Sequence, residues 1–133
     1  MARSISVALV AAVVLATAAG AATAGTHRFF ELPGANPPEC ELAAHVKGLG
    51  TFVYCLVGPA HATSVTMGPT GLLTICRGVK CMSNAPENAR RLAYGKSIHA
   101  DPFTCTAERT GIRCVVTRLG HGFLLSRTSL KRI

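Results

Sequence analysis

The chain has 133 residues, with 14 lysine and arginine residues against 6 aspartate and glutamate residues, which gives a formal net charge of +8. This length is enough for one modest hydrophobic core and argues against a second domain. The excess of positive charge favours anionic partners, such as envelope polymers, phospholipid head groups, nucleic acid or an acidic protein.

The N-terminal stretch has the three-part layout of a secretory signal peptide. A short start with one charge, Arg3, precedes an uncharged apolar run and then a series of small residues that ends at Ala24. The run is short and rich in alanine, whereas a transmembrane helix needs roughly 20 strongly apolar residues. We therefore expect a signal peptide over residues 1–24 and a single secreted, disulfide-stabilised domain over residues 25–133. The alternative is a retained amino-terminal anchor.

The remainder of the chain has the pattern of short strands joined by turns. The 13 glycines and 7 prolines of the whole chain are scattered, and no apolar stripe at helical spacing persists for three turns. One short helical turn is predicted at Asn84–Leu92, where Asn84 can cap and Pro86 suits the first turn. We expect an all-β or β-rich fold, a small disulfide-stapled sandwich or barrel-like meander of about six strands with at most one short helix. The candidate strands are His27–Leu32, Glu39–Leu42, Thr51–Val57, Leu72–Arg77, Phe103–Ala107, Ile112–Thr117 and Phe123–Ser126.

All six cysteines lie after the predicted signal peptide, and their number is even. In a secreted chain of this size that pattern indicates a disulfide framework, whereas in the cytosol it would indicate metal or redox chemistry.

Hairpin geometry predicts two of the disulfides. A hairpin with its turn at Arg109–Thr110 would place two cysteines directly opposite each other, within disulfide reach. The segments Glu39–Leu42 and Thr51–Val57 would do the same for a second pair. The third pair is obtained by elimination, although six cysteines allow 15 pairings and sequence alone does not choose among them. The predicted pairs are Cys40 with Cys55, Cys76 with Cys81, and Cys105 with Cys114.

A zinc site is the alternative use of the cysteines, because structural zinc sites favour closely spaced cysteines together with histidines. Cys76 and Cys81 are separated by four residues, and His99 and His121 could complete a set of ligands. The sequence has no second close pair of cysteines, so we expect no metal and no cofactor.

Catalytic motifs are scarce. The chain lacks a nucleophile elbow and a His-Glu-x-x-His motif, and an even cysteine count leaves no spare thiol nucleophile. Glu39 and Glu41 share one face of a predicted strand, as a carboxylate pair for glycoside cleavage would. Ordinary strand alternation produces the same spacing, so we do not expect an enzyme.

The closing part of the chain carries a distinctive set of motifs. The set resembles a family of short secreted bacterial proteins with a domain of unknown function, whose members show Leu-x-Tyr-Gly, a Phe-x-Cys to Cys hairpin and Gly-His-Gly-Phe-x-x-Ser-Arg. The chain departs from that pattern in the segment before Cys40 and at Cys81. The resemblance implies export and a compact disulfide domain, and no established activity. The residues that carry it are Leu92, Tyr94, Gly95, Phe103, Cys105, Cys114, Gly120, His121, Gly122, Phe123, Ser126 and Arg127.

Together these features predict a secreted, non-enzymatic binding or cell-envelope-associated module, located outside the cell or in its envelope. The partner is unknown. An anionic envelope component or an acidic protein suits the charge, and we expect neither dedicated nucleic-acid binding nor a transmembrane span in the mature chain. The candidate surface site is His121, Ser126 and Arg127, although a tight turn also explains the glycines around His121. Two alternatives stay open: a basic inhibitor or antimicrobial effector acting on an anionic target, and a small hydrolase that uses His121.

Overall fold

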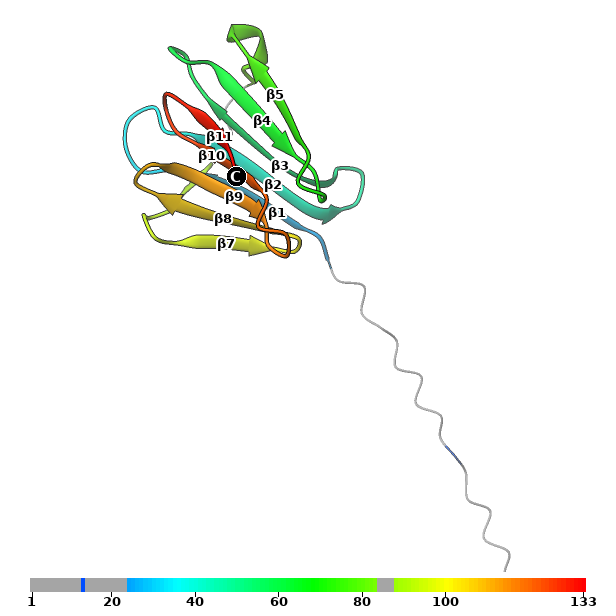
Figure 1. Cartoon of the computed structure of the whole chain (residues 1–133). Helices are drawn as coiled ribbons and strands as arrows, with labels where there is room; N and C mark the ends of the chain where they lie inside the picture. Colours follow the sequence, from blue (N-terminus) through cyan, green and yellow to red (C-terminus); the bar gives the residue numbers. More distant parts are fainter. Residues whose placement is uncertain (1–12, 14–23, 84–87) are drawn as a thin grey trace, which may run out of the picture.

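Two β-sheets pack face to face in the computed structural model, which describes Val13, residues 24–83 and residues 88–133 (Figure 1). The six-stranded sheet has the strand order β5-β4-β3-β2-β1-β6, and the five-stranded sheet has the order β11-β10-β9-β8-β7. Neighbouring strands are antiparallel, apart from the parallel pair of β1 and β6. The strands are β1 Thr26–Glu31, β2 Glu39–Val46, β3 Gly50–Val57, β4 Thr63–Met67, β5 Leu73–Arg77, β6 Arg90–Arg91, β7 Ser97–Ala100, β8 Phe103–Glu108, β9 Gly111–Val116, β10 Gly122–Leu125 and β11 Leu130–Arg132.

The core lies between the sheets and results from alternation along the strands. In β8, every second side chain is buried, beginning with Phe103, while the residues between them face outward. Successive strand residues point to opposite faces, so this pattern marks a sheet with one face on the core. The largest fully buried side chains are Phe30, Phe103, Phe123, Leu42, Met67 and Ile112.

The three predicted disulfides are confirmed. Cys40 is paired in register with Cys55 across β2 and β3, and Cys105 with Cys114 across β8 and β9. In both pairs the Cα atoms are 4.1 Å apart, as expected for directly opposed residues without ladder hydrogen bonds between them. The third bridge, Cys76–Cys81, closes a short loop at the end of β5 that contains the 3-10 turn η1, Val79–Cys81.

The β-rich class and the seven predicted strand locations are confirmed, whereas the number of strands and the helical turn are not. The structure adds β4, β6, β7 and β11, so the fold has more strands than expected. The predicted turn at Asn84–Leu92 falls partly outside the described residues, and residues 88–92 form no helix there. Instead Arg90 and Arg91 form a short strand that extends the six-stranded sheet beside Phe30 and Glu31. Among the described residues, no helix is long and apolar enough to cross a membrane.

The strand connections gather at two opposite ends of the sandwich. The β1–β2, β8–β9 and β10–β11 connections meet at what we call the pocket end. The β2–β3, β4–β5, β7–β8 and β9–β10 connections meet at the other end, which we call the leucine end. In Figure 1 the β2–β3 and β4–β5 turns lie on the right and the β1–β2 loop lies on the left. At about 3.3 Å per residue, the eight-residue strand β2 separates the ends by about 25 Å.

Candidate functional site

The candidate site is a hollow of about 250 Å³ at the pocket end, where loops of both sheets converge. The β1–β2 loop forms one wall, and the β8–β9 and β10–β11 turns form the others. Its lining combines apolar residues with two arginines and several hydroxyl-bearing residues. The lining residues are Leu32, Pro33, Pro38, Tyr94, Arg109, Thr110, Gly111, Ser126, Arg127 and Thr128.

The proline-rich β1–β2 loop shapes the wall beside Arg127. The backbone N–H of Leu32 donates a hydrogen bond to the carbonyl of Pro38 (3.2 Å), which closes the loop at its base. Gly34 has a φ of +108°, and a Cβ atom there would collide with the guanidinium of Arg127. The backbone angle is the reason that glycine is favoured at this position, because the end of the flexible Arg127 side chain could move away from a larger residue.

Arg109 is held against the ring of Tyr94. Its guanidinium carbon lies 5.0 Å from the ring centroid, within the range of a cation–π interaction. The Tyr94 hydroxyl in turn donates to the carbonyl of Pro33 (3.5 Å), which links this aromatic platform to the opposite wall. The arrangement limits the conformations of a long, flexible side chain before any ligand binds.

The β10–β11 turn positions Arg127 through the hydroxyl of Ser126. The backbone N–H groups of Thr128 and Ser129 both donate to Ser126 Oγ, at 3.3 and 3.0 Å. The Oγ atoms of Ser126 and Ser129 are 2.9 Å apart. A side chain that binds the backbone two and three residues ahead defines a compact turn, and Arg127 lies at the centre of it.

Both arginines of the hollow lack a carboxylate partner among the residues that the structure describes. The ion pairs found there lie elsewhere, between Glu31 and Arg91 (3.1 Å) and between His27 and Glu41 (2.8 Å). Unpaired guanidinium groups beside hydroxyl donors match the oxygens of a carboxylate, phosphate or sulfate group. The hollow can therefore hold an oxyanion by charge-assisted hydrogen bonds.

A scan against protein families matches residues 63–132 to a family of unknown function (DUF6636). The chain belongs to this family. No curated protein and no solved structure matches the chain. The DUF6636 range starts at β4 and so leaves out β1 to β3, although these strands form the middle of the six-stranded sheet.

The DUF6636 range contains most of the hollow. Tyr94, Arg109, Ser126 and Arg127 lie within it, while the wall at Leu32–Pro38 lies before it. The family residues thus supply the charged and hydroxyl groups, and the preceding segment supplies an apolar wall.

The predicted surface site is only partly assembled in this DUF6636 member. Ser126 and Arg127 line the hollow together. His121 precedes β10 and Ser126 comes after it, so they lie at opposite ends of the sandwich. His121 is exposed and packs beside Gly71, whose added Cβ would lie 3.3 Å from the Cβ of His121. The predicted trio does not form because the extended strand β10 separates His121 from Ser126 and Arg127.

Tyr94 and Arg109 were not predicted as site residues. Tyr94 stood out only within the Leu-x-Tyr-Gly motif, and Arg109 only as part of a hairpin turn. Their convergence depends on the packing of the β8–β9 turn against the segment before β7, which no sequence spacing reveals. Arg127 follows Ser126 in a turn without an acidic residue, which is a weak signal, whereas Arg109 directly follows Glu108 and carries no such signal.

The two glutamates considered for glycoside cleavage lie in a different hollow, of about 240 Å³, on the outer face of the six-stranded sheet. Phe29 and Tyr54 also line it. Burial, and secondly the negative charge of Glu31, raise the pKa of Glu39 above its usual range. Glu41 is bound by His27, whose Nε2 lies 2.8 Å from Glu41 Oε1.

The cysteines considered for metal binding are joined to each other by a disulfide. Cys76–Cys81 belongs to the six-stranded sheet and its adjoining loop, whereas His99 is in β7 and His121 precedes β10. His99 contacts Thr104, with Nδ1 3.0 Å from the threonine Oγ1. The structure does not bring these four residues together.

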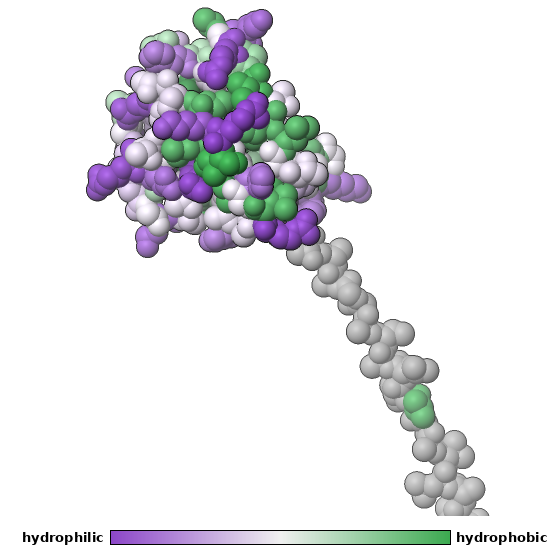
Figure 2. Space-filling view, viewed as in Figure 1, coloured by the Kyte–Doolittle hydropathy of each residue, from purple (hydrophilic) through white to green (hydrophobic). Residues whose placement is uncertain are grey.

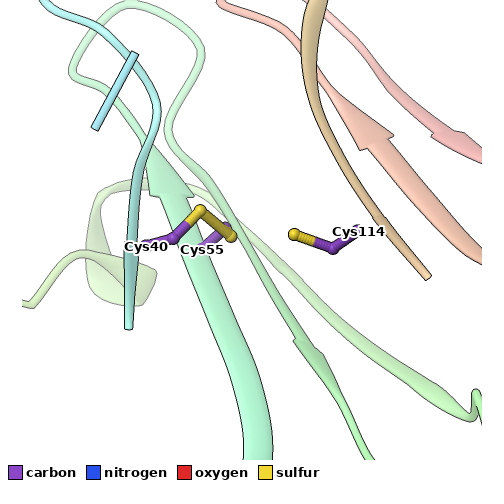
Figure 3. A group of neighbouring side chains, drawn as sticks. All are labelled: Cys40, Cys55 and Cys114. Carbon is purple, nitrogen blue, oxygen red and sulfur yellow. A yellow bond between two sulfur atoms is a disulfide. The ribbon is translucent and has the colours of Figure 1, made fainter. Parts of the chain in front are cut away.

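A different group of sulfur atoms lies in the core. The Sγ atoms of Cys40, Cys55 and Cys114 all lie within 4.8 Å of one another. Figure 3 shows the sulfur of Cys114 facing the Cys40–Cys55 bridge across the interior. All three are disulfide-bonded, so the group is a packing contact in the core between one bridge from each sheet.

Proposed function

We propose that this protein is an exported, non-enzymatic binding module that holds the oxyanion group of a ligand in the hollow at the pocket end. The observation that supports this proposal most directly is that Arg109 and Arg127 line the same hollow. Neither arginine has a carboxylate partner among the described residues. The ligand class is an anionic component of the cell envelope or an acidic protein. Export is supported by three disulfides, which are typical of oxidising compartments.

Preorganisation supports binding as the role of this hollow. The Arg109 side chain contacts Tyr94, and the hydrogen bonds of Ser126 hold the backbone of the turn that carries Arg127. Each sheet of the sandwich beneath them contains a buried disulfide between neighbouring strands, β2 with β3 and β8 with β9. A site that is ordered in advance loses less side-chain entropy when a ligand binds.

The hydrolase alternative has less support. His121 lies at the far end of β10 from Ser126 and Arg127, and within residues 24–83 and 88–133 the histidine that contacts a carboxylate is His27. The effector alternative uses the same basic hollow and differs only in the consequence of binding. It requires loss of function of the anionic target when the protein is added, which a binding module does not cause.

Oxyanion titrations test the proposal. We expect inorganic phosphate and acetate to shift the amide resonances of the β8–β9 and β10–β11 turns in NMR spectra. Arg109→Ala or Arg127→Ala should weaken binding about tenfold or more, because each removes a charge-assisted hydrogen bond. Arg28→Ala is the matched control, since Arg28 is exposed and lies outside the hollow. An equal loss in the control, or no shifts near the hollow, would overturn the proposal.

A further inference from the structure

The leucine end carries apolar side chains that are exposed on its turns. Leu49 is 43% exposed in the β2–β3 turn, Leu72 is 74% exposed beside the β4–β5 turn, and Leu119 is 45% exposed in the β9–β10 turn. The C-terminal residue, Ile133, is 37% exposed and hydrogen-bonds through its backbone to Gly122 at the same end. Four of the exposed large hydrophobic residues in the sandwich thus lie at one end.

These turns protrude and surround a common hollow. A Cβ atom placed at Gly48 or at Gly120 would meet nothing within 4 Å, so open space surrounds both turns. The hollow between the turns has a volume of about 410 Å³. Its lining residues lie in or directly beside the four connections at this end: His45, Thr51, Pro69, Asp101, Pro102, Val116 and Arg118.

Three of the four exposed hydrophobic residues have a cation close by in the sequence. Lys47 lies two residues before Leu49, Arg118 precedes Leu119, and Arg132 precedes Ile133. Among the described connections at this end, the one acidic side chain is that of Asp101. Figure 2 shows apolar side chains at the surface where β5 and the C-terminus lie, between protruding hydrophilic side chains. The end therefore combines separate apolar projections with a net positive charge.

We infer that the leucine end is a docking surface for an anionic lipid bilayer. The leucines enter the boundary between head groups and acyl chains, and the neighbouring cations lie at the level of the anionic head groups. Interfacial binding of this kind depends on buried apolar area plus attraction to anionic lipid. A protein partner would instead require a continuous, complementary apolar patch, whereas these leucines lie on separate turns around a hollow.

The path of the chain supports this orientation. β1 begins at the leucine end, where Thr26 pairs with Ala44 and Gly25 packs on the backbone of His45. Residues 1–24 are therefore joined to the domain at this end. A retained amino-terminal anchor would hold the same end against the bilayer. The proposed orientation is therefore the same whether the predicted signal peptide is cleaved or retained.

A tryptophan reporter gives the most direct test, because the chain contains no tryptophan of its own. The tryptophan fluorescence emission of the Leu72→Trp variant should shift to the blue when vesicles of phosphatidylcholine with about 30% phosphatidylglycerol are added. Brominated acyl chains should also quench it. Val79→Trp is the matched control, since Val79 is 77% exposed but lies at the pocket end. Equal quenching at both positions, or none at Leu72→Trp, would overturn the inference.

Vesicle sedimentation gives the second test. Leu72→Ser with Leu119→Ser should lower the partition coefficient about tenfold or more, because each leucine loses apolar contact, while Val79→Ser should leave it unchanged. Charge reversal by Lys47→Glu should lower binding more than Lys80→Glu, which lies in η1 at the pocket end. The inference would be overturned if the double leucine variant bound vesicles as well as the wild-type chain does. It would also be overturned if the wild-type chain formed a dimer that the leucine variants lose. The oxyanion titrations use other residues, so the two proposals can fail separately.

Discussion

Glu39 illustrates how a single residue sets a pH dependence. It lies opposite Glu31 in the β1–β2 register, and like charges placed directly opposite each other are destabilising. Burial, together with this neighbouring charge as the smaller cause, raises the pKa of Glu39 in the folded state. The folded protein then binds the proton more tightly than the unfolded chain does. The contribution of the Glu39 proton to the free energy of unfolding is therefore complete at pH values below the pKa of Glu39 in the unfolded chain. This contribution is lost as the pH rises through the pKa of Glu39 in the folded protein.

Glu39→Gln should therefore raise the free energy of unfolding at about pH 7, by no more than about 1 kcal/mol because solvent screens this half-buried group. The gain should vanish below about pH 4, where the wild-type carboxyl is protonated as well. Urea unfolding at both pH values measures the difference. Glu41→Gln removes the same charge but also the contact with His27, so it should bring no gain. A stabilisation by Glu41→Gln equal to that of Glu39→Gln would contradict this explanation.

At the scale of the elements, the three disulfides should contribute unequally. The Cys105–Cys114 bridge spans nine residues and is fully buried, whereas Cys76–Cys81 spans five and is partly exposed. Replacing both cysteines of the buried bridge by alanine should cost about 3 to 5 kcal/mol, from lost loop constraint and from the cavity left behind. The same change at the exposed bridge should cost about 2 kcal/mol or less. Denaturant unfolding ranks the two double variants, and the reverse order would refute this assignment.

The hairpins were predictable because their information is local. A cysteine pair placed symmetrically about a short turn specifies both register and bridge, as β8 and β9 show. The two-residue strand β6 pairs with β1 from a position about 60 residues along the chain, and no local pattern encodes such a contact. Strand β4, Thr63–Met67, was missed because two of its buried residues are Thr63 and Ser64, which do not mark a core strand.

The candidate site was predictable only where its residues are neighbours in sequence. Ser126 and Arg127 share one turn, whereas Arg109 reaches the hollow from another hairpin.

The two glycines that flank His121 were predicted to allow unusual backbone angles, and this explains only one of them. Gly120 has a φ of +70°, as predicted, but Gly122 is required because a Cβ atom there would collide with the carbonyl of Cys114. Close approach of one strand to the next is a property of the sheet and cannot be read from the turn motif.

For the whole molecule, the two ends should act independently. They are separated by about 25 Å of rigid β-structure, and substitutions that far apart without shared partners act additively. A chain that carries Arg109→Ala and Arg127→Ala should lose oxyanion binding and keep its affinity for anionic vesicles. The pair Leu72→Ser and Leu119→Ser should do the reverse.

Because both measurements use the same folded sandwich, unfolding would remove both activities together, and circular dichroism of each variant excludes that outcome.

The expected independence of the two ends has a functional consequence. If the leucine end rests on a bilayer, the strands run away from the membrane and the hollow opens on the side that faces outward, where an anionic envelope component is accessible. Vesicle-bound protein should therefore bind phosphate as well as free protein does, by equilibrium dialysis. Competition between vesicles and phosphate in the wild-type chain would show instead that one basic surface serves both ligands.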